Sequence, residues 1–473
     1  METNIIYFSF TFFLFFIYFI AISLFGFLIQ LIFNRAYLNK KVNLKRILKA
    51  FAIGLSIHLI YGTIIISLRI LNFFTIYLPF ILCDIGLLIY ILYKKSTSIK
   101  KYFKILNKHK VFLFFKEKGS IIFIFIIVFS LLYILQMYFI DDTLGYVGND
   151  AYYWFKNIWF VHKYGYLDYS SILSYPPGYL MFCSTMISPI NDYTFVYFFL
   201  KYLPFFLTII NLLVLFVISN DIFKEKIYIF FTLVIYLGFT YLFYRSFKPV
   251  PSVLATSLGF LFLLFLGKET SNEINLKISS IKVFLISNIK NKYVLSKGLL
   301  LTGITLIQPL YGMFYMIFYL SYECFLFLIR YKSKYISFNP RLLLLRNYIF
   351  SQLLIILVCV LLLSPFVIGT SLNRKSFILK SYFSYATSRE SLELSIISNL
   401  GDILKNLREW LIFESGYRFF DKSIYFIFDR THILSFYRET ILVGFFIIFY
   451  GIFLNFKKSH KINEKQNNFV NFI

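Results

Sequence analysis

The chain has 473 residues, of which 59% are hydrophobic and 15% are charged, and its mean hydropathy is +0.74. Soluble domains carry about 25% charged residues and disordered chains are far less hydrophobic, so both classes are excluded. The class that remains is a membrane protein with many helical spans, each of about 20 apolar residues.

The charge distribution also points to a membrane. Lysine and arginine number 48 against 22 acids, so the net charge is +26. In a soluble protein such a charge would suggest a nucleic-acid partner. Here the basic residues gather between apolar runs, as in 34–47 and 94–118, where the positive-inside rule accounts for them. We therefore expect no nucleic acid among the partners.

Apolar runs in chain order predict about 11 transmembrane helices. The runs cover 5–33, 48–71, 72–93, 119–140, 193–219, 226–244, 249–267, 293–308, 310–330, 348–370 and 437–455. Net-positive loops at 34–47, 94–118, 268–297, 331–347 and 456–473 are predicted to face the cytoplasm, which leaves 141–192 and 371–436 outside. The predicted fold is an all-α polytopic integral membrane protein, with the plasma membrane as its expected location.

The predicted organisation has four parts. A leading three-span unit with a basic linker covers 1–118, and a central membrane module covers 119–370. A small external cap follows at 371–436, and the last span with its basic tail covers 437–473. The four cysteines stand singly, so neither a disulfide framework nor a zinc site is predicted.

The external loop from Asp141 to Tyr179 is the most informative segment. Apolar and aromatic residues recur in it at helical spacing and basic or amide residues form a polar side, which predicts helices that lie in the membrane interface. The apolar residues are Trp154, Phe155, Ile158 and Trp159, and the polar ones are Lys156, Asn157 and Lys163. Pro176 and Pro177 are suited to start a short entering or re-entrant helix over 176–190.

A second informative segment is a short polar break between two apolar runs. The apolar run that ends at Ile307 meets Gln308 and Pro309, and another run begins at once. Proline ends a preceding helix, so the two runs are predicted to form a tight membrane hairpin.

Three sequence features together resemble the GT-C superfamily of polytopic membrane glycosyltransferases, which includes protein O-mannosyltransferases and bacterial aminoarabinose transferases. They are Asp150-Ala151-Tyr152-Tyr153, the glycine turn at Gly165, and Tyr175-Pro176-Pro177-Gly178-Tyr179. A weaker match is the segment 298–311, GLLLTGITLIQPLY, which is similar to paired helices of the family. The resemblance covers roughly 119–370, about half of the chain, and would make that module catalytic.

The resemblance implies transfer of a sugar from a polyprenyl-phosphate donor to a glycan, lipid or protein acceptor at the non-cytoplasmic face of the membrane. Such a transfer needs a base that removes the proton of the acceptor hydroxyl, and a placed base contributes about 10²–10⁴ in rate. Asp150 is the first candidate for this catalytic role. Asp142 and Asp141 are further candidates, although adjacent acids can instead end a span or bind a divalent metal ion, the one cofactor predicted.

The donor phosphate requires cations on the outer side. Arginine binds phosphate through two parallel donors, whereas lysine acts as a point charge. External basic residues are Arg245, Lys248, Arg374, Lys375 and Arg389, and they are predicted to bind the phosphate or, in the alternative, to anchor the helices at lipid headgroups. The family often has an acid in the outer turn around 245–252, where this chain has Ser246, Pro251 and Ser252.

Polar residues in the apolar runs support a rival function. Asp84 and His58 lie about equally far from the turn near 71–72, on neighbouring spans, so a direct pair between them is predicted. The pair is either a packing contact or the proton relay of a transporter or lipid-carrier flippase, in which Lys201 would also matter. A third alternative, a polymerase or ligase of surface glycans, shares the lipid-linked donor.

Overall fold

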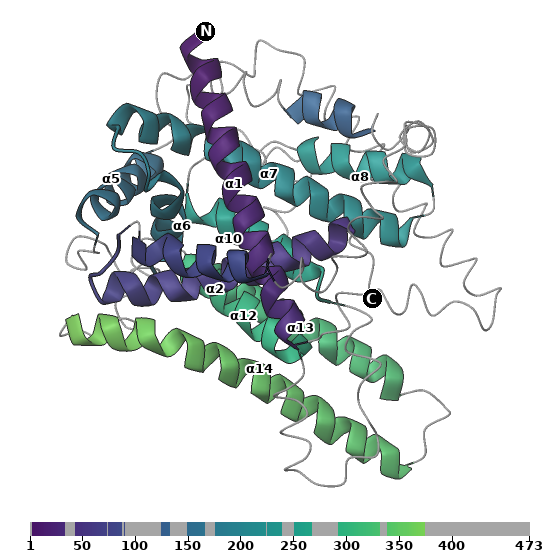
Figure 1. Cartoon of the computed structure of the whole chain (residues 1–473). Coiled ribbons are helices and arrows are strands. Elements are labelled where there is room, and N and C mark those ends of the chain that lie inside the picture. Colours follow the sequence, from purple (N-terminus) through teal and green to yellow (C-terminus); the bar gives the residue numbers. More distant parts are fainter. Residues whose placement is uncertain are drawn as a thin grey trace, which may run out of the picture.

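The structure is a computed structural model that describes residues 2–33, 43–72, 74–87, 89, 124–132, 149–165, 176–223, 225–238, 250–266, 292–331 and 338–373. Every regular element within these ranges is a helix, which confirms the all-α prediction. Two helices cover Phe74–Leu87 and residues 124–132, and the others are α1 (Glu2–Phe33), α2 (Leu44–Ser67), α5 (Asn149–Tyr164), α6 (Gly178–Ile187), α7 (Tyr193–Ile222), α8 (Lys226–Gly238), α10 (Pro251–Leu263), α12 (Lys292–Ile307), α13 (Pro309–Tyr331) and α14 (Phe338–Asn373) (Figure 1).

Three of the described helices are long and apolar enough to cross a membrane. They are Ile6–Ile32, Leu44–Ile66 and Tyr193–Ile222. Large apolar side chains on the outside of the helices, such as Phe13 and Phe16 on α1, are at least half exposed, as expected for a surface that lipid covers. These features support a membrane protein, and the count of about 11 spans stays a prediction.

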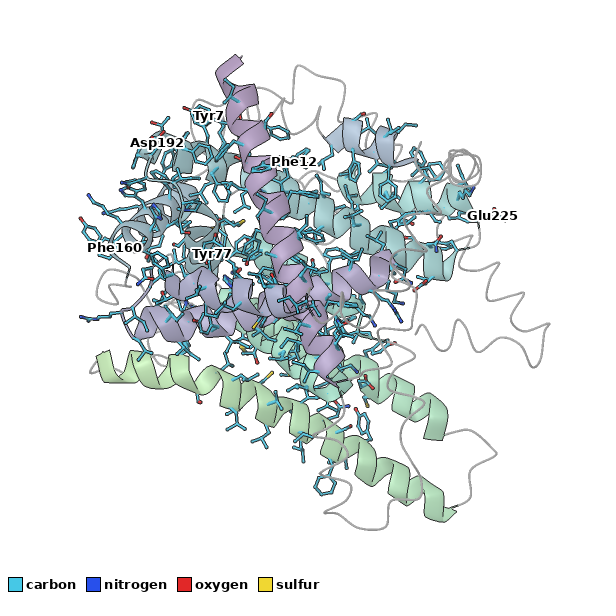
Figure 2. The ribbon with its side chains drawn as sticks, in the orientation of Figure 1. Tyr7, Phe12, Tyr77, Phe160, Asp192 and Glu225 are labelled. Carbon is cyan, nitrogen blue, oxygen red and sulfur yellow. The ribbon has the colours of Figure 1, made fainter. Side chains whose placement is uncertain are left out.

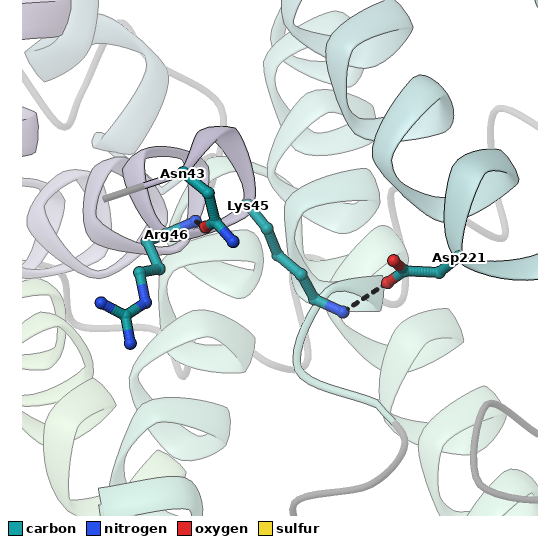
Figure 3. A network of polar contacts seen from close by, with 4 residues as sticks. All are labelled: Asn43, Lys45, Arg46 and Asp221. Atoms are coloured by element: carbon teal, nitrogen blue, oxygen red, sulfur yellow. Dashed lines mark hydrogen bonds and ion pairs between the residues drawn. The ribbon is translucent and has the colours of Figure 1, made fainter. Parts of the chain in front are cut away.

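Helices α2 and α7 extend between the two ends of the bundle. At one end, the turn after α2 contacts the C-terminus of α5 through Leu71, and the first residues of α7 contact α5 through Tyr193. At the other end, the Lys45 ammonium group of α2 lies 2.6 Å from the Asp221 carboxylate of α7 (Figure 3). Figure 2 shows Phe160 and Asp192 at the end that holds α5, and Glu225 at the opposite end. We call the first of these the α5 end.

Capping residues fix where these two helices begin. The Asn43 side chain accepts a hydrogen bond of 3.1 Å from the backbone N–H of Arg46 and caps α2. The Asp192 side chain accepts one of 2.9 Å from the N–H of Thr194 and caps α7. Both bonds satisfy backbone donors that the first helical turn leaves unpaired.

Helices α1 and α2 pack with their backbones in contact. A methyl group added to Gly26 would meet the carbonyl oxygen of Ala50, and one added to Gly54 would meet that of Ile22. Small residues allow this close approach, which favours helix association by van der Waals packing where lipid surrounds the helices. Residues of α1 and α2 belong to one apolar core with α6, α7, α10 and α12.

Helix α14 differs from the predicted run 348–370 because it begins ten residues earlier, at Phe338. The additional turns carry Arg341 and Arg346, which the sequence interpretation left in a loop. A helix does not have to stop where apolar character stops, because arginine is as good a helix former as leucine.

Candidate functional site

Helix α5 has a buried aromatic and aliphatic face that contains residues of the predicted apolar side, and its predicted position in the membrane interface stays a prediction. Trp154, Phe155 and Ile158 are buried, whereas Lys156 and Lys163 are exposed. Positions separated by three or four residues share one face of a helix, so the pattern directs this face to the bundle. The helix begins at Asn149, and Asp150 is therefore in its first turn.

One residue of the predicted polar face is placed differently. Asn157 is buried, and its side-chain amide donates a hydrogen bond of 2.9 Å to the backbone oxygen of Tyr153. The prediction of an exposed Asn157 was wrong because the residue lies next to the buried Trp154 and Val161, three residues before it and four residues after it in the helix. The bond to a carbonyl one turn back offsets the cost of burying the amide.

The end of α5 is fixed by Gly165. This residue has a φ of +72°, and its N–H donates a hydrogen bond of 2.9 Å to the Val161 oxygen. A side chain at this position would also meet the carbonyl oxygen of Leu71. Glycine suits both the left-handed backbone and the close approach, and the glycine turn predicted from the sequence is confirmed.

Aromatic rings connect α5 to the start of α7. Phe155 makes edge-to-face contacts with Tyr193 at 4.8 Å and with Tyr197 at 5.8 Å between ring centroids. Trp159 contacts Tyr193 at 5.3 Å and the His162 ring at 5.6 Å. Burial lowers the pKa of His162 below its usual value, although a hydrogen bond with the backbone of Ile190 opposes this shift.

Residues 176–179 form a buried start of α6. Pro177 is its N-cap residue, and the Met181 N–H donates a hydrogen bond of 2.8 Å to the Pro177 oxygen, so the prolines start a helix as predicted. The helix is ten residues long, in agreement with a short element rather than a full span. The Tyr179 ring lies edge-to-face with Trp154 of α5 at 5.7 Å.

Gly178 brings this motif against the end of α12. A methyl group added to Gly178 would lie 2.5 Å from the Leu306 oxygen and 3.0 Å from the Ile307 nitrogen. Leu306 and Ile307 belong to the segment 298–311, which carries the weaker family resemblance. The two stretches are more than 100 residues apart in sequence and are in backbone contact in the fold.

Helices α12 and α13 form the predicted tight hairpin. Only Gln308 separates them, and a methyl group added to Gly312 would meet Thr305 of the other helix. At the base of the hairpin the Lys297 ammonium group lies 2.9 Å from the Glu323 carboxylate, with the two side chains 1% and 6% exposed. The Tyr319 ring lies below the same ammonium group, with 4.9 Å to its centroid. A buried ion pair therefore connects the two helices.

A buried polar cluster adjoins α6. The Thr185 hydroxyl donates a hydrogen bond of 2.7 Å to the Met181 oxygen, so it accepts the bond of 3.1 Å that joins it to Nε2 of His58. This assignment leaves Nδ1 of His58 as an acceptor. The Tyr77 hydroxyl donates to the backbone oxygen of Thr185. Sequence reasoning found His58 but missed Thr185 and Tyr77, which lie in apolar runs without a periodic signal.

The predicted direct pair between Asp84 and His58 was wrong. Among the described residues the partner of His58 is Thr185, and Oδ1 of Asp84 has no hydrogen-bond partner. The His58 ring instead packs against Phe80, at 4.9 Å between centroids, one helical turn before Asp84. Equal distance along the chain from the turn at 71–72 placed the two residues at nearly the same height in neighbouring helices. It did not determine which side chain His58 would contact.

Several predicted site residues lie outside the described part of the chain. They are Asp141, Asp142, Tyr175, Arg245, Lys248, Arg374, Lys375 and Arg389. Tyr152 is exposed and Tyr153 is half-buried on α5. Within the described ranges no three His, Cys, Asp or Glu side chains form a group that could hold a metal ion, and the metal ion proposed for Asp141 and Asp142 stays a prediction.

Comparison of the chain with protein-family models, with curated proteins and with solved structures gives no match. In the part of the chain that the structure describes, the fold is all-α, and its three long apolar helices indicate the class of membrane proteins.

Proposed function

We propose that the protein is a membrane glycosyltransferase that transfers a sugar from a polyprenyl-phosphate donor to a glycan, lipid or protein acceptor on the non-cytoplasmic face. The observation that supports this proposal is the backbone contact between Gly178 and the end of α12. It joins two of the stretches that resemble the GT-C superfamily, 175–179 and 298–311. Helix α5, whose first turn contains Asp150, packs on the same α6 through Trp154 and Tyr179.

In the proposed reaction Asp150 takes the proton of the acceptor hydroxyl. The hydroxyl oxygen forms a bond to the anomeric carbon of the donor sugar, and the bond between that carbon and the phosphate oxygen breaks. Polyprenyl phosphate leaves with the electron pair. Cations would stabilise the leaving phosphate, and the candidates are Arg245, Lys248, Arg374, Lys375 and Arg389.

The test is incorporation of labelled sugar from a panel of polyprenyl-phosphate donors into lipid, glycan and protein by membranes that contain the full chain. Asp150→Asn removes the base and is expected to lower transfer by about 10²–10⁴. Asp192→Asn is the matched control, because it neutralises another acid close to α5 while asparagine still caps α7. Equal transfer by wild type and Asp150→Asn, at equal amounts of inserted protein, would remove Asp150 from the mechanism.

A transporter or lipid-carrier flippase is the second candidate. The observation that favours it is Asp84, a buried acid with an Oδ1 atom that has no hydrogen-bond partner among the described residues. Ionisable residues inside membrane helices are costly and often mark transport pathways. In this case Asp84→Asn would abolish transport in reconstituted vesicles and Asp150→Asn would not. A polymerase or ligase of surface glycans would be recognised by its acceptor in the same transfer assay.

A further inference from the structure

Several buried side chains of the first helices have polar atoms without a hydrogen-bond partner in the described part of the chain, and three of these atoms belong to side chains that lie near one another. The atoms are the Tyr18 hydroxyl, Nδ1 of His58 and Oδ1 of Asp84, on residues that are 5%, 1% and 8% exposed. They belong to α1, α2 and the Phe74–Leu87 helix. Most buried polar atoms in proteins have a partner, and a group of exceptions in one region therefore indicates a bound polar molecule.

Ring contacts place these side chains in one region. The Tyr18 and His58 rings are edge-to-face at 5.7 Å between centroids. The His58 ring also packs on Phe80 at 4.9 Å. Asp84 follows Phe80 by four residues, so both side chains project from one face of their helix, about 6 Å apart along its axis. His58 therefore lies between Tyr18 and the helical face that carries Asp84.

The chemistry of the three atoms selects the bound molecule. Nδ1 of His58 is an acceptor because its other ring nitrogen donates to Thr185, and an ionised Asp84 also accepts only. Two acceptors do not satisfy one another, whereas a water molecule donates two hydrogen bonds and accepts from the Tyr18 hydroxyl. A calcium ion would require six to eight oxygen ligands, and Tyr18 and Asp84 supply at most three.

We propose that α1, α2 and the Phe74–Leu87 helix bind internal water that hydrogen-bonds to Tyr18, His58 and Asp84, so that the imidazole and the carboxyl group are linked through water instead of directly. The water site is independent of the chemistry proposed for Asp150.

The experiment uses the full chain in lipid vesicles with ¹⁵N-labelled histidine, and measures magnetisation transfer from water to the ring nitrogens by solid-state NMR. His58→Gln identifies the His58 signals by their loss. His162, which is half-buried on α5, is the internal reference for a ring near water. We expect the signal of Nδ1 of His58 to build up at mixing times as short as those of His162. Absence of transfer at those times would overturn the proposal.

A second pair of variants tests the link to Asp84. Asp84→Leu removes the carboxyl group and eases membrane insertion, so a change in signal does not come from failure to insert. It is expected to lower the water transfer to His58 several-fold. Ile85→Leu places the same side chain at the next position, where the native residue is 48% exposed, and is expected to leave the transfer unchanged. Equal transfer in wild type and Asp84→Leu would refute a water link between the two groups.

Discussion

Substitution of Gly178 by alanine tests the contact on which the proposed function depends. The new methyl group would lie 2.5 Å from the Leu306 oxygen and 2.7 Å from its carbonyl carbon, whereas ordinary contacts are 3.4–4 Å. Backbone atoms of a helix cannot rotate away, so α6 must move from α12 by about 1 Å. Overpacking of this kind costs about 1–3 kcal/mol. A shift of about 1 Å near reacting groups can lower the rate about 10²-fold.

The assay compares the thermal unfolding midpoint in detergent and the sugar-transfer rate of Gly178→Ala with those of Gly86→Ala. A methyl group added to Gly86 would meet no atom within 4 Å, so the same change there creates no clash. Alanine is the better helix former, and Gly86→Ala is expected to be as stable as wild type or more so. If both variants match wild type in midpoint and rate, the close approach of α6 to α12 is refuted.

Two further predictions concern ionisable groups. Glu323→Gln should lower the unfolding midpoint strongly, because loss of one partner of a buried ion pair costs about 3–5 kcal/mol. Asp221→Asn at the exposed pair with Lys45 should change stability by less than about 1 kcal/mol, and equal effects of the two variants would contradict the burial of the first pair. His162 has a lowered pKa in the folded state, so the unfolded chain binds more protons as the pH falls below about 6.5, and stability should fall with it. His162→Gln should remove this part of the pH dependence of the midpoint, and an unchanged profile would show that His162 is not the titrating group.

Local patterns predicted the local elements well. The spacing of Trp154, Phe155 and Ile158 gave the buried face of α5, the two prolines gave the start of α6, and Gln308-Pro309 gave the hairpin. Each of these depends on residues within a few turns of one another. Such signals follow from helix periodicity and from the missing N–H of proline.

Contacts between distant segments could not be predicted in the same way. His58 and Thr185 are 127 residues apart, and apolar residues surround both, so no periodic pattern marks their faces. The pair of Asp84 and His58 was inferred only from their equal distance from the turn between two neighbouring helices. That distance does not determine how each helix is rotated about its axis. The acids and cations predicted for the reaction, apart from Asp150, lie outside the described residues.

The ion pair at the base of the α12–α13 hairpin also bears on how the protein enters the membrane. Lys297 and Glu323 carry opposite charges, and because only Gln308 separates the two helices, the charges meet as soon as the hairpin closes. Either helix inserted alone would bring an unpaired charge into the apolar phase. We therefore expect the two helices to leave the translocation machinery together, with these two charges already paired.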